Sequence, residues 1–489
     1  MTIRKVKKGK ELLEKLKLSL KRILNKKEYA IVYIIVLIPF TAMMIYFINY
    51  VNVDSDITIN NVYNPRGEIL ESLTRRGPIC DRNGEILAQT IVNENGKEER
   101  IYPHDNLFSH VVGYSTNGKK GIERIANYRL IMSDIDEATK IKNDINGEKN
   151  PGNHVISTLD VNLQEVADGA MGVYQGAIVV IEVKTGKVLA MVSKPDFNPN
   201  KIEEMWEELR NDNESSVLLN RSIQGLYPPG STFKILTSLE YISENNNDIS
   251  SYRYNCNGSI RKEDEKIKCY HGANHGSVDF TESFKKSCNT SFVNVGLSLN
   301  GDEFANTLSE AYFGKEMPIE LNYKKSVVDI DSESTVENVM QTSIGQGTTL
   351  VTPMHMAMIA GAIANDGIMM KPYFIDSVRN DAGKVVDEYE PEEVSRVMSE
   401  KESDILSMLM EEVVLDGTGH KLSDLSYTAA GKTGSAEYNE NPLDSHAWFV
   451  GFAPVEEPEI ALAVIIEGAG SGGDYAVPMA KRVFDEYFE

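Results

Sequence analysis

An uncharged apolar stretch, Tyr29–Ile48, constrains what this chain can fold into more than any other feature. At about 1.5 Å per residue, a helix of this length spans the roughly 30 Å hydrocarbon core of a bilayer. Pro39 is compatible with a membrane helix, and no small-residue cleavage site follows the stretch. A buried core helix is the alternative, but such a helix seldom lacks a polar face. We expect an uncleaved signal anchor at residues 29–48.

The distribution of charge predicts the orientation of this anchor. Residues 1–50 hold 11 Lys/Arg and 3 Asp/Glu, whereas the whole chain holds 50 and 73, for a formal net charge of −23. The positive-inside bias predicts a cell-membrane protein with a single pass, a cytoplasmic basic tail at residues 1–28 and an extracytoplasmic body after about residue 49. The tail could lie on membrane lipid or remain solvated. An acidic body argues against nucleic acid as a partner.

Turn residues and apolar runs divide the extracytoplasmic part into two predicted domains. Residues 49–150 are polar and turn-rich, and they carry no catalytic cluster, which is typical of a non-catalytic module or spacer. A boundary is expected near Asn150–Asn153, and residues 151–489 show no internal linker. We predict that residues 151–489 form one domain.

Two predicted hairpins lie at opposite ends of this second domain. Ala177–Val183 and Val188–Val192 flank a turn, and so do Ala447–Phe452 and Ile460–Ile466. Helical patterns fill most of the sequence between the hairpins. Strands at both ends with helices between them predict an α+β fold, in which helices flank an antiparallel sheet that joins the two ends.

The segment Pro228–Lys234, Pro-Pro-Gly-Ser-Thr-Phe-Lys, carries the first candidate chemistry. Pro and Gly precede apolar residues at helical spacing, so a helix is expected to begin here. Residues three apart share a helix face, which would place Ser231 beside Lys234 as a nucleophile and its base. The positive end of the helix dipole would favour the serine oxyanion and disfavour protonation of the lysine.

Spacing alone does not single out this pair, because the chain repeats each short motif. Ser-x-x-Lys also occurs at Ser259, in a segment read as a loop, and at Ser283, on a helix face expected to be exposed. Lys-Thr-Gly occurs at Lys184, where it is ordinary turn chemistry, and again at Lys432. By itself, Ser231 would more often be a helix N-cap than a nucleophile.

The order of the remaining motifs is informative. Ser231-Thr-Phe-Lys is followed by Ser287-Cys-Asn and then by Lys432-Thr-Gly, an order that resembles penicillin-binding proteins and serine β-lactamases. Further stretches resemble the same transpeptidases, and Arg76–Gly84 is similar to the start of the N-terminal module of class B penicillin-binding proteins. The further stretches are Ser343–Gly347, Gly417–Gly419 and Ala447–Pro454.

The resemblance implies a penicillin-binding/β-lactamase-like transpeptidase domain and a serine D,D-transpeptidase that uses no cofactor. The implied substrates are D-Ala-D-Ala stem peptides of peptidoglycan, and the implied inhibitors are β-lactam antibiotics. A membrane glycosyltransferase is a further expected partner. The implied catalytic residues are Ser231, Lys234, Ser287 and Asn289. The residues implied to bind the substrate are Lys432, Thr433, Gly434 and Ser435.

Other functions remain compatible with the motifs. A β-lactamase or a β-lactam-sensing receptor also carries a Ser-Thr-Phe-Lys stretch, although the Ser-Cys-Asn form of the second motif argues against both. A D,D-carboxypeptidase would pass the acyl group to water. An inactive cell-wall scaffold would be expected to lose part of the motif set.

The cysteines leave several structures open. Cys256 and Cys269 are followed by His271 and His275, and the spacing C-x12-C-x-H-x3-H matches no strong zinc pattern. Free thiols, a disulfide and a metal site all remain possible in an extracytoplasmic compartment. We expect no metal.

Overall fold

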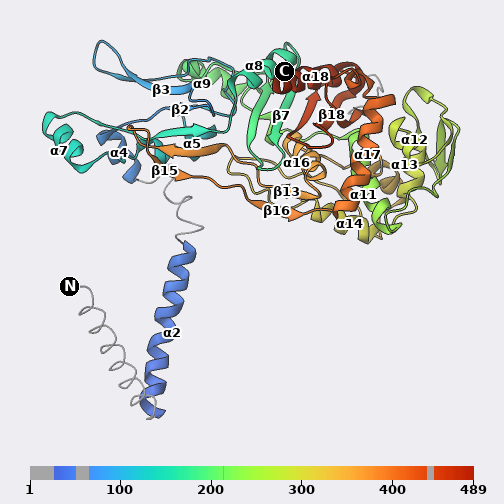
Figure 1. Ribbon diagram of the computed structural model, residues 1–489, viewed down its shortest axis with the longest axis horizontal. Helices are drawn as coiled ribbons and strands as arrows, with labels where there is room; N and C mark the ends of the chain where they lie inside the picture. The colour runs from blue at the N-terminus through green and yellow to red at the C-terminus, as the bar shows by residue number, and fades with distance from the viewer. Residues whose placement is uncertain (1–26, 51–64, 213, 438–444) are drawn as a thin grey trace. The chain divides into compact units, whose positions relative to one another are not determined.

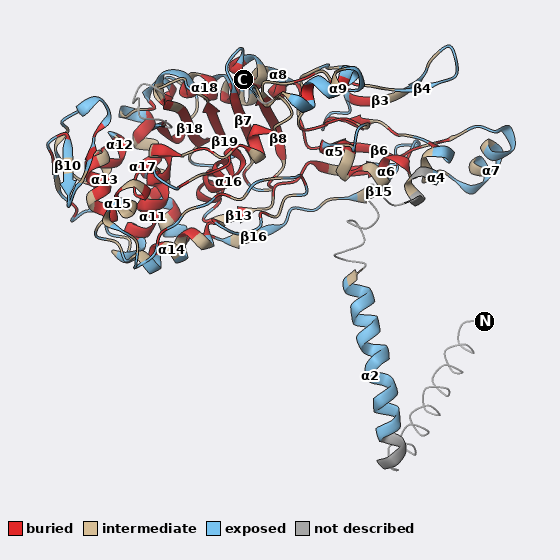
Figure 2. Cartoon of the chain, turned by 180° about the vertical axis from the view of Figure 1, so that it is seen from behind, coloured by how far each residue is buried: buried red, intermediate tan, exposed pale blue. Residues whose placement is uncertain are grey.

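The computed structural model describes residues 27–50, 65–212, 214–437 and 445–489, which belong to two compact units, Met1–Glu68 and Ile69–Glu489. In the first unit, helix α2 covers Lys27–Asn49, and its segment Ile31–Asn49 is long and apolar enough to cross a membrane. The expected anchor is therefore a single exposed helix (Figure 2). The predicted basic tail lies almost entirely outside the described residues.

A five-stranded antiparallel sheet forms the centre of the second unit, in the order β17-β18-β19-β7-β8. Strand β19 pairs with β7 along its length, from Ile460 opposite Glu182 to Ile466 opposite Gly176. Both predicted hairpins are confirmed, and so is a sheet that joins the two ends of the domain. The strands are β7 (Gly176–Glu182), β8 (Val188–Lys194), β17 (Ala430–Glu437), β18 (Ser445–Ala453) and β19 (Ile460–Ile466).

Helices cover both faces of this sheet (Figure 1). Alternate strand residues pack on α16 (Pro353–Ala364) on one face and on α8 (Val161–Met171) and α18 (Val477–Phe488) on the other. Every residue of β19 is buried, which explains why its sequence is a continuous apolar run rather than an alternating one. Figure 2 shows the resulting buried core in red.

A second, six-stranded sheet, in the order β15-β14-β6-β2-β3-β4, underlies the N-terminal module. Its strands β14 and β15 lie more than 200 residues further along the chain than β6, and β14 pairs with β6 through Val378 opposite Val155. The strands are β2 (Ile79–Cys80), β3 (Ile86–Val92), β4 (Glu98–Ile101), β6 (His154–Ser157), β14 (Ile375–Arg379) and β15 (Val385–Glu388). The sheet thus takes strands from both sides of residue 150, and the boundary placed there stays a prediction.

Smaller elements complete this module. Strand β1 pairs in parallel with β5 through Thr74 opposite Asn150. The elements are α4 (Pro65–Leu73), β1 (Thr74–Arg75), α5 (Gly121–Ile125), α6 (Asn127–Ile131), α7 (Glu137–Asn146) and β5 (Asn150–Pro151).

Helices dominate between the two hairpins, as expected, but they are interrupted by short strands. The helices are α9 (Ile202–Asn211), α10 (Arg221–Gln224), α11 (Lys234–Glu244), α12 (Phe280–Lys285), α13 (Asn289–Gly296), α14 (Gly301–Glu310), α15 (Val336–Thr342) and α17 (Glu400–Asp416). The strands are β9 (Tyr254–Cys256), β10 (Ser259–Lys262), β11 (Glu265–Lys268), β12 (Gly276–Val278), β13 (Ile368–Met370) and β16 (Glu393–Arg396).

Two expectations about the repeated motifs were wrong. Ser259 lies on strand β10 rather than in a loop, because β10 and β11 form a hairpin. Ser283 is buried rather than on an exposed helix face, and its hydroxyl donates to the Asp279 carbonyl at 2.6 Å. Lys184 lies in the turn between β7 and β8, as predicted.

Candidate active site

The turn that carries Ser231 is a 3-10 segment, η3 (Gly230–Phe233), at the start of α11. The indole N–H of Trp448 donates to the Pro228 carbonyl at 3.0 Å, and the Gly230 N–H donates to the Gly345 carbonyl at 2.9 Å. Trp448 is fully buried, so it belongs to the core. The core of the domain therefore holds the turn in place, while Ser231 stays half-buried at the wall of a cavity.

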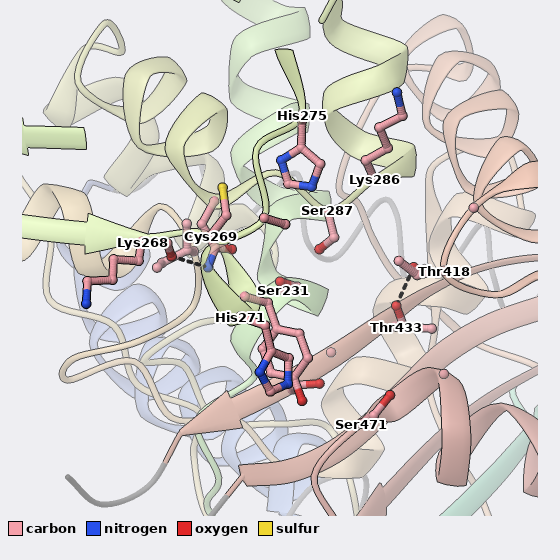
Figure 3. Close-up of a pocket in the computed structure, with 18 of the residues that line it drawn as sticks. Ser231, Lys268, Cys269, His271, His275, Lys286, Ser287, Thr418, Thr433 and Ser471 are labelled. Carbon is pink, nitrogen blue, oxygen red and sulfur yellow. Dashed lines mark hydrogen bonds between the residues drawn. The ribbon is translucent and has the colours of Figure 1, made fainter. Parts of the chain in front are cut away.

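This cavity is an open cleft of about 1260 Å³ between the helical part and the edge strand β17 (Figure 3). Six of the predicted site residues line it, and Figure 3 shows Ser231, Ser287 and Thr433 in the wall. The six are Ser231, Ser287, Asn289, Thr433, Gly434 and Ser435. The remaining two predicted residues, Lys234 and Lys432, are fully buried behind the cavity surface.

The amine of Lys234 connects the first motif to the second. Its Nζ donates to the Ser287 carbonyl at 2.7 Å, to Ser287 Oγ at 3.2 Å and to Asn289 Oδ1 at 2.7 Å. The same amine lies 5.4 Å from the centre of the Phe292 ring. Burial lowers the pKa of Lys234 to about 7, so a large fraction of this amine is neutral at physiological pH.

The third motif reaches the same hydroxyl from the sheet. Lys432 Nζ donates to Ser287 Oγ at 3.0 Å and to the Thr433 carbonyl at 3.1 Å. Burial, and to a smaller extent the positive charge of Lys234, holds the pKa of Lys432 well below its usual value. An incoming carboxylate would reverse this effect, because it would compensate the buried charge.

The backbone at Ser287 is unusual for a residue with a side chain. Its φ is +53°, a left-handed conformation that non-glycine residues seldom adopt. This conformation ends the segment after α12, and Asn289 then begins α13 with Cys288 as its N-cap. The turn lets the hydroxyl of Ser287 accept hydrogen bonds from two lysines of different motifs.

Several residues that line the cavity were not among the predicted site residues. Thr418 and Thr433 share a hydrogen bond of 2.5 Å between their hydroxyls, and Ser471 lies beside the same strand (Figure 3). Tyr270 and His271 line the cavity from the loop after β11. Thr418 lies in the Gly417–Gly419 stretch and His271 follows Cys269, so the sequence pointed to both without giving either a place in the site, whereas Ser471 and Tyr270 had no such signal.

Comparison with known proteins identifies the family. The model of the penicillin binding protein transpeptidase domain matches residues 176–485, and that of the penicillin binding protein A dimerisation domain matches residues 76–155. The chain is similar to the peptidoglycan D,D-transpeptidase PbpA of Mycolicibacterium smegmatis, at 30% identity over 85% of this chain and 90% of the relative.

Solved structures agree with these matches. The D,D-transpeptidase domain of a peptidoglycan glycosyltransferase from Eggerthella lenta is 30% identical, with a TM-score of 0.75 over 85% of this chain and 98% of that chain. Penicillin-binding protein A from M. tuberculosis, solved as a ceftriaxone acyl-enzyme complex, is 28% identical, with a TM-score of 0.78 over 86% of this chain and 100% of that chain. This chain belongs to the penicillin-binding protein transpeptidase family.

Proposed function

We propose that the chain is a membrane-anchored serine D,D-transpeptidase that cross-links peptidoglycan stem peptides through an acyl-enzyme on Ser231. The observation that carries this proposal is the convergence of three sequence motifs on the Ser287 hydroxyl, which lies 3.2 Å from Lys234 Nζ and 3.0 Å from Lys432 Nζ. Such a hydroxyl, held between two buried amines beside a half-buried serine, is suited to move protons during acyl transfer.

The first step forms the acyl-enzyme. Ser231 Oγ attacks the carbonyl between the two D-alanines, and its proton passes to the neutral amine of Lys234. The carbon–nitrogen bond then breaks as Ser287 Oγ passes its proton to the leaving amine. Lys234 gives the proton it took from Ser231 to Ser287 Oγ at 3.2 Å, and D-alanine departs. The pKa of Lys234 near 7 supports this role, since a base must be unprotonated at the working pH. Asn289 would hold the amide of the substrate.

Two further groups would stabilise the substrate. Lys432 and Thr433 would bind the terminal carboxylate by charge and hydrogen bond. The backbone N–H groups of Ser231 and Ser435 would hold the oxyanion. Close packing supports this pairing, because a Cβ added at Gly230 would lie 3.0 Å from the Ser435 carbonyl oxygen.

In the second step, an amine from another stem peptide attacks the acyl-enzyme ester. The ester bond breaks, a new amide forms, and the proton of the amine returns to Ser231 Oγ through the same lysine. A β-lactam would acylate Ser231 by opening its ring, and no leaving group would depart to make room for an acceptor. The chain would therefore be a target of β-lactam antibiotics.

The location of the chain follows from its anchor. We place residues 1–28 in the cytoplasm, the anchor at 29–48, a spacer module at 49–150 and the catalytic domain at 151–489 outside the membrane. The charge distribution around the apolar helix supports this orientation. A membrane glycosyltransferase that supplies the glycan strand is the partner we propose for this arrangement.

The test is a product assay with the full chain in detergent, a stem peptide that ends in D-Ala-D-Ala and a second peptide that carries a free amine. Transpeptidation predicts release of D-alanine together with a cross-linked dimer. D-Alanine release without a dimer would favour a carboxypeptidase, and rapid turnover of penicillin would favour a β-lactamase. If Ser231→Ala retained the activity, a different nucleophile would have to be sought.

A further inference from the structure

Behind the second motif, three cysteines and a histidine converge. The Sγ atoms of Cys256, Cys269 and Cys288 and a ring nitrogen of His275 all lie within 4.8 Å of one another. Cys269 Sγ lies 3.7 Å from Cys256 Sγ and 3.8 Å from Cys288 Sγ, and Cys256 Sγ lies 3.4 Å from His275 Nδ1. Three of the ligand atoms come from the segment Tyr254–Val278, and the fourth comes from Cys288 at the start of α13.

These separations match a tetrahedral ion and do not match a disulfide. A bonded sulfur pair lies about 2.05 Å apart. Two thiolates on one zinc ion, each at about 2.3 Å from it, are separated by about 3.8 Å when the geometry is tetrahedral. A histidine nitrogen at about 2.1 Å from the same ion would lie about 3.6 Å from each sulfur. We propose that Cys256, Cys269, Cys288 and His275 bind one zinc ion.

The surroundings of the sulfurs suit thiolate ligands. All three cysteines are buried, and buried thiolates need compensation by charge or hydrogen bonds. The Gly258 N–H donates to Cys256 Sγ at 3.5 Å, from a turn in which Gly258 has a φ of +84°. Outer hydrogen bonds of this kind orient metal ligands and tune them. Three soft sulfurs and one imidazole favour zinc over magnesium or calcium.

A second hydrogen-bonding group lies against the same sulfurs. Thr290 Oγ1 is 3.2 Å from Cys256 Sγ, 3.4 Å from Cys288 Sγ and 3.6 Å from Cys269 Sγ. One hydroxyl proton can serve only one sulfur at a time. The Thr290 hydroxyl can therefore compensate one thiolate at a time, and the proposed cation would compensate the others.

The segment Tyr254–Val278, which supplies three of the four ligands, has only a small hydrophobic core to stabilise it. Between Tyr254 and Val278 the strands are only three or four residues long, and only three of their 14 side chains are buried. Structures with so small a core are commonly held together by a disulfide or a metal. The zinc ion would tie this segment to the start of α13 through Cys288.

The position of Cys288 connects the proposed zinc ion to the active site. Cys288 lies between Ser287 and Asn289, whose side chains reach Lys234. Asn289 Nδ2 also donates at 3.0 Å to the carbonyl of Lys268, the residue that precedes Cys269. Figure 3 shows Cys269 and His275 beside Ser287 at the cavity. We assign the ion a positioning role, in which it fixes the strained turn at Ser287 and does not touch the substrate.

The spacing of Cys256 and Cys269 in the sequence could not reveal this site. The sequence predicts no metal, because C-x12-C-x-H-x3-H matches no strong zinc pattern. The structure selects His275 rather than His271, and it adds Cys288 from within the catalytic motif. A ligand set so widely spread becomes visible only when the fold brings its parts together.

The test begins with the metal content of the full chain, purified in detergent under reducing conditions and without a chelator. Elemental mass spectrometry is expected to find about one zinc per chain, since structural zinc sites bind tightly at neutral pH. Cys256→Ser and His275→Ala are expected to retain less than about 0.2 zinc per chain. The matched controls are Cys80→Ser, a buried cysteine outside the cluster, and His271→Ala, and both are expected to keep the ion.

Experiments on the wild-type chain test the proposal even where a variant fails to fold. Removal of the ion with a chelator is expected to lower the thermal midpoint and to slow acylation by penicillin, and ZnCl2 is expected to restore both. Replacement with CoCl2 is expected to give the thiolate charge-transfer and visible bands of a tetrahedral site. The proposal is overturned if the wild-type chain holds no zinc and takes up neither metal, or if intact mass shows a Cys256–Cys269 disulfide.

Discussion

Lys432 Nζ donates to Ser287 Oγ at 3.0 Å, although 145 positions of sequence separate the two residues. The bond joins the edge strand β17 to the turn before α13, across the floor of the cleft. It explains how the second and third motifs can act on one substrate. The amine of Lys432 is buried. Its hydrogen bonds to residues that the structure describes go to a hydroxyl and a carbonyl, and none goes to a carboxylate.

The first prediction concerns this amine. We expect Lys432→Ala to lower kcat/KM for a peptide that ends in a free carboxylate by about 100-fold, because a buried charge partner is lost. For the same peptide with a C-terminal amide, kcat/KM should fall much less, so the preference of the enzyme for a free carboxylate should decrease. Rates of acylation by both peptides measure this. Lys421→Ala, which removes another lysine at the cavity, is the control and should keep the preference.

The second prediction concerns the pH dependence of acylation. Burial lowers the pKa of Lys234 to about 7. With the neutral amine as the proposed base, the rate constant for acylation by penicillin should fall about tenfold per pH unit below the pKa and level off above it. Stopped-flow measurements across this range test the profile. A rate that does not change between about pH 5.5 and 8 would rule out Lys234 as the base. Lys262→Ala, in the repeated motif on β10, should leave the profile unchanged.

The third prediction concerns the loop that supports the nucleophile. Gly345 has a φ of +71°, and a Cβ there would lie 2.2 Å from the Gly230 carbonyl oxygen. Gly345→Ala should therefore displace the turn that carries Ser231. Because a misplacement of the reacting group by about 1 Å greatly slows such reactions, acylation should be slowed at least about tenfold. Gly314 has the same φ, but a Cβ added there would meet no atom within 4 Å. Gly314→Ala is therefore the control that introduces the backbone strain without the steric clash. Equal rates for the two variants would contradict a supporting role for the loop.

The fourth prediction concerns stability in the N-terminal module. Glu123 is fully buried, and its carboxylate pairs with Arg76 at 2.5 Å and Arg100 at 2.7 Å. Burial raises the pKa of Glu123, but the two guanidinium groups outweigh it and the net shift is downward. The stabilisation is therefore present above the unfolded-state pKa of about 4.3 and is lost as the pH falls through the lower folded-state pKa.

Glu123→Gln leaves two partly buried guanidinium groups without their counter-charge, which costs about 3–5 kcal/mol. A fall of several degrees in the thermal midpoint at neutral pH is the expected result. Glu137→Gln, at an exposed ion pair with Lys140, should change the midpoint little. A midpoint equal to that of the wild type would mean that the arginines find other partners.

Local sequence was enough to predict part of this fold. The apolar runs that became β7, β8, β18 and β19 have no polar alternation because both sheet faces are covered, and turns separate them clearly. The pairing of β14 with β6 could not be predicted in this way. Its strand Ile375–Arg379 is short and pairs with residues more than 200 positions away, so nothing local specifies the partner.

The site shows the same division. Motif order pointed to Ser231, Lys234, Ser287 and Lys432. The structure places the two serines in the wall of one cleft, with both lysines buried behind it and bonded to Ser287. Their roles in catalysis stay predictions. The sequence could not show that Ser287 has a left-handed backbone, or that the sulfur of Cys288 lies within 4.8 Å of two other cysteine sulfurs, since both depend on how distant segments pack.

The most direct test is mass spectrometry of the full chain after incubation with penicillin, followed by mapping of the modified peptide. The account predicts one covalent adduct per chain, located on Ser231, and no adduct on Ser231→Ala. Ser259→Ala, in the repeated Ser-x-x-Lys motif on β10, should be labelled like the wild type. An adduct on any other residue, or none on the folded wild-type chain, would contradict the assignment of Ser231 as the nucleophile.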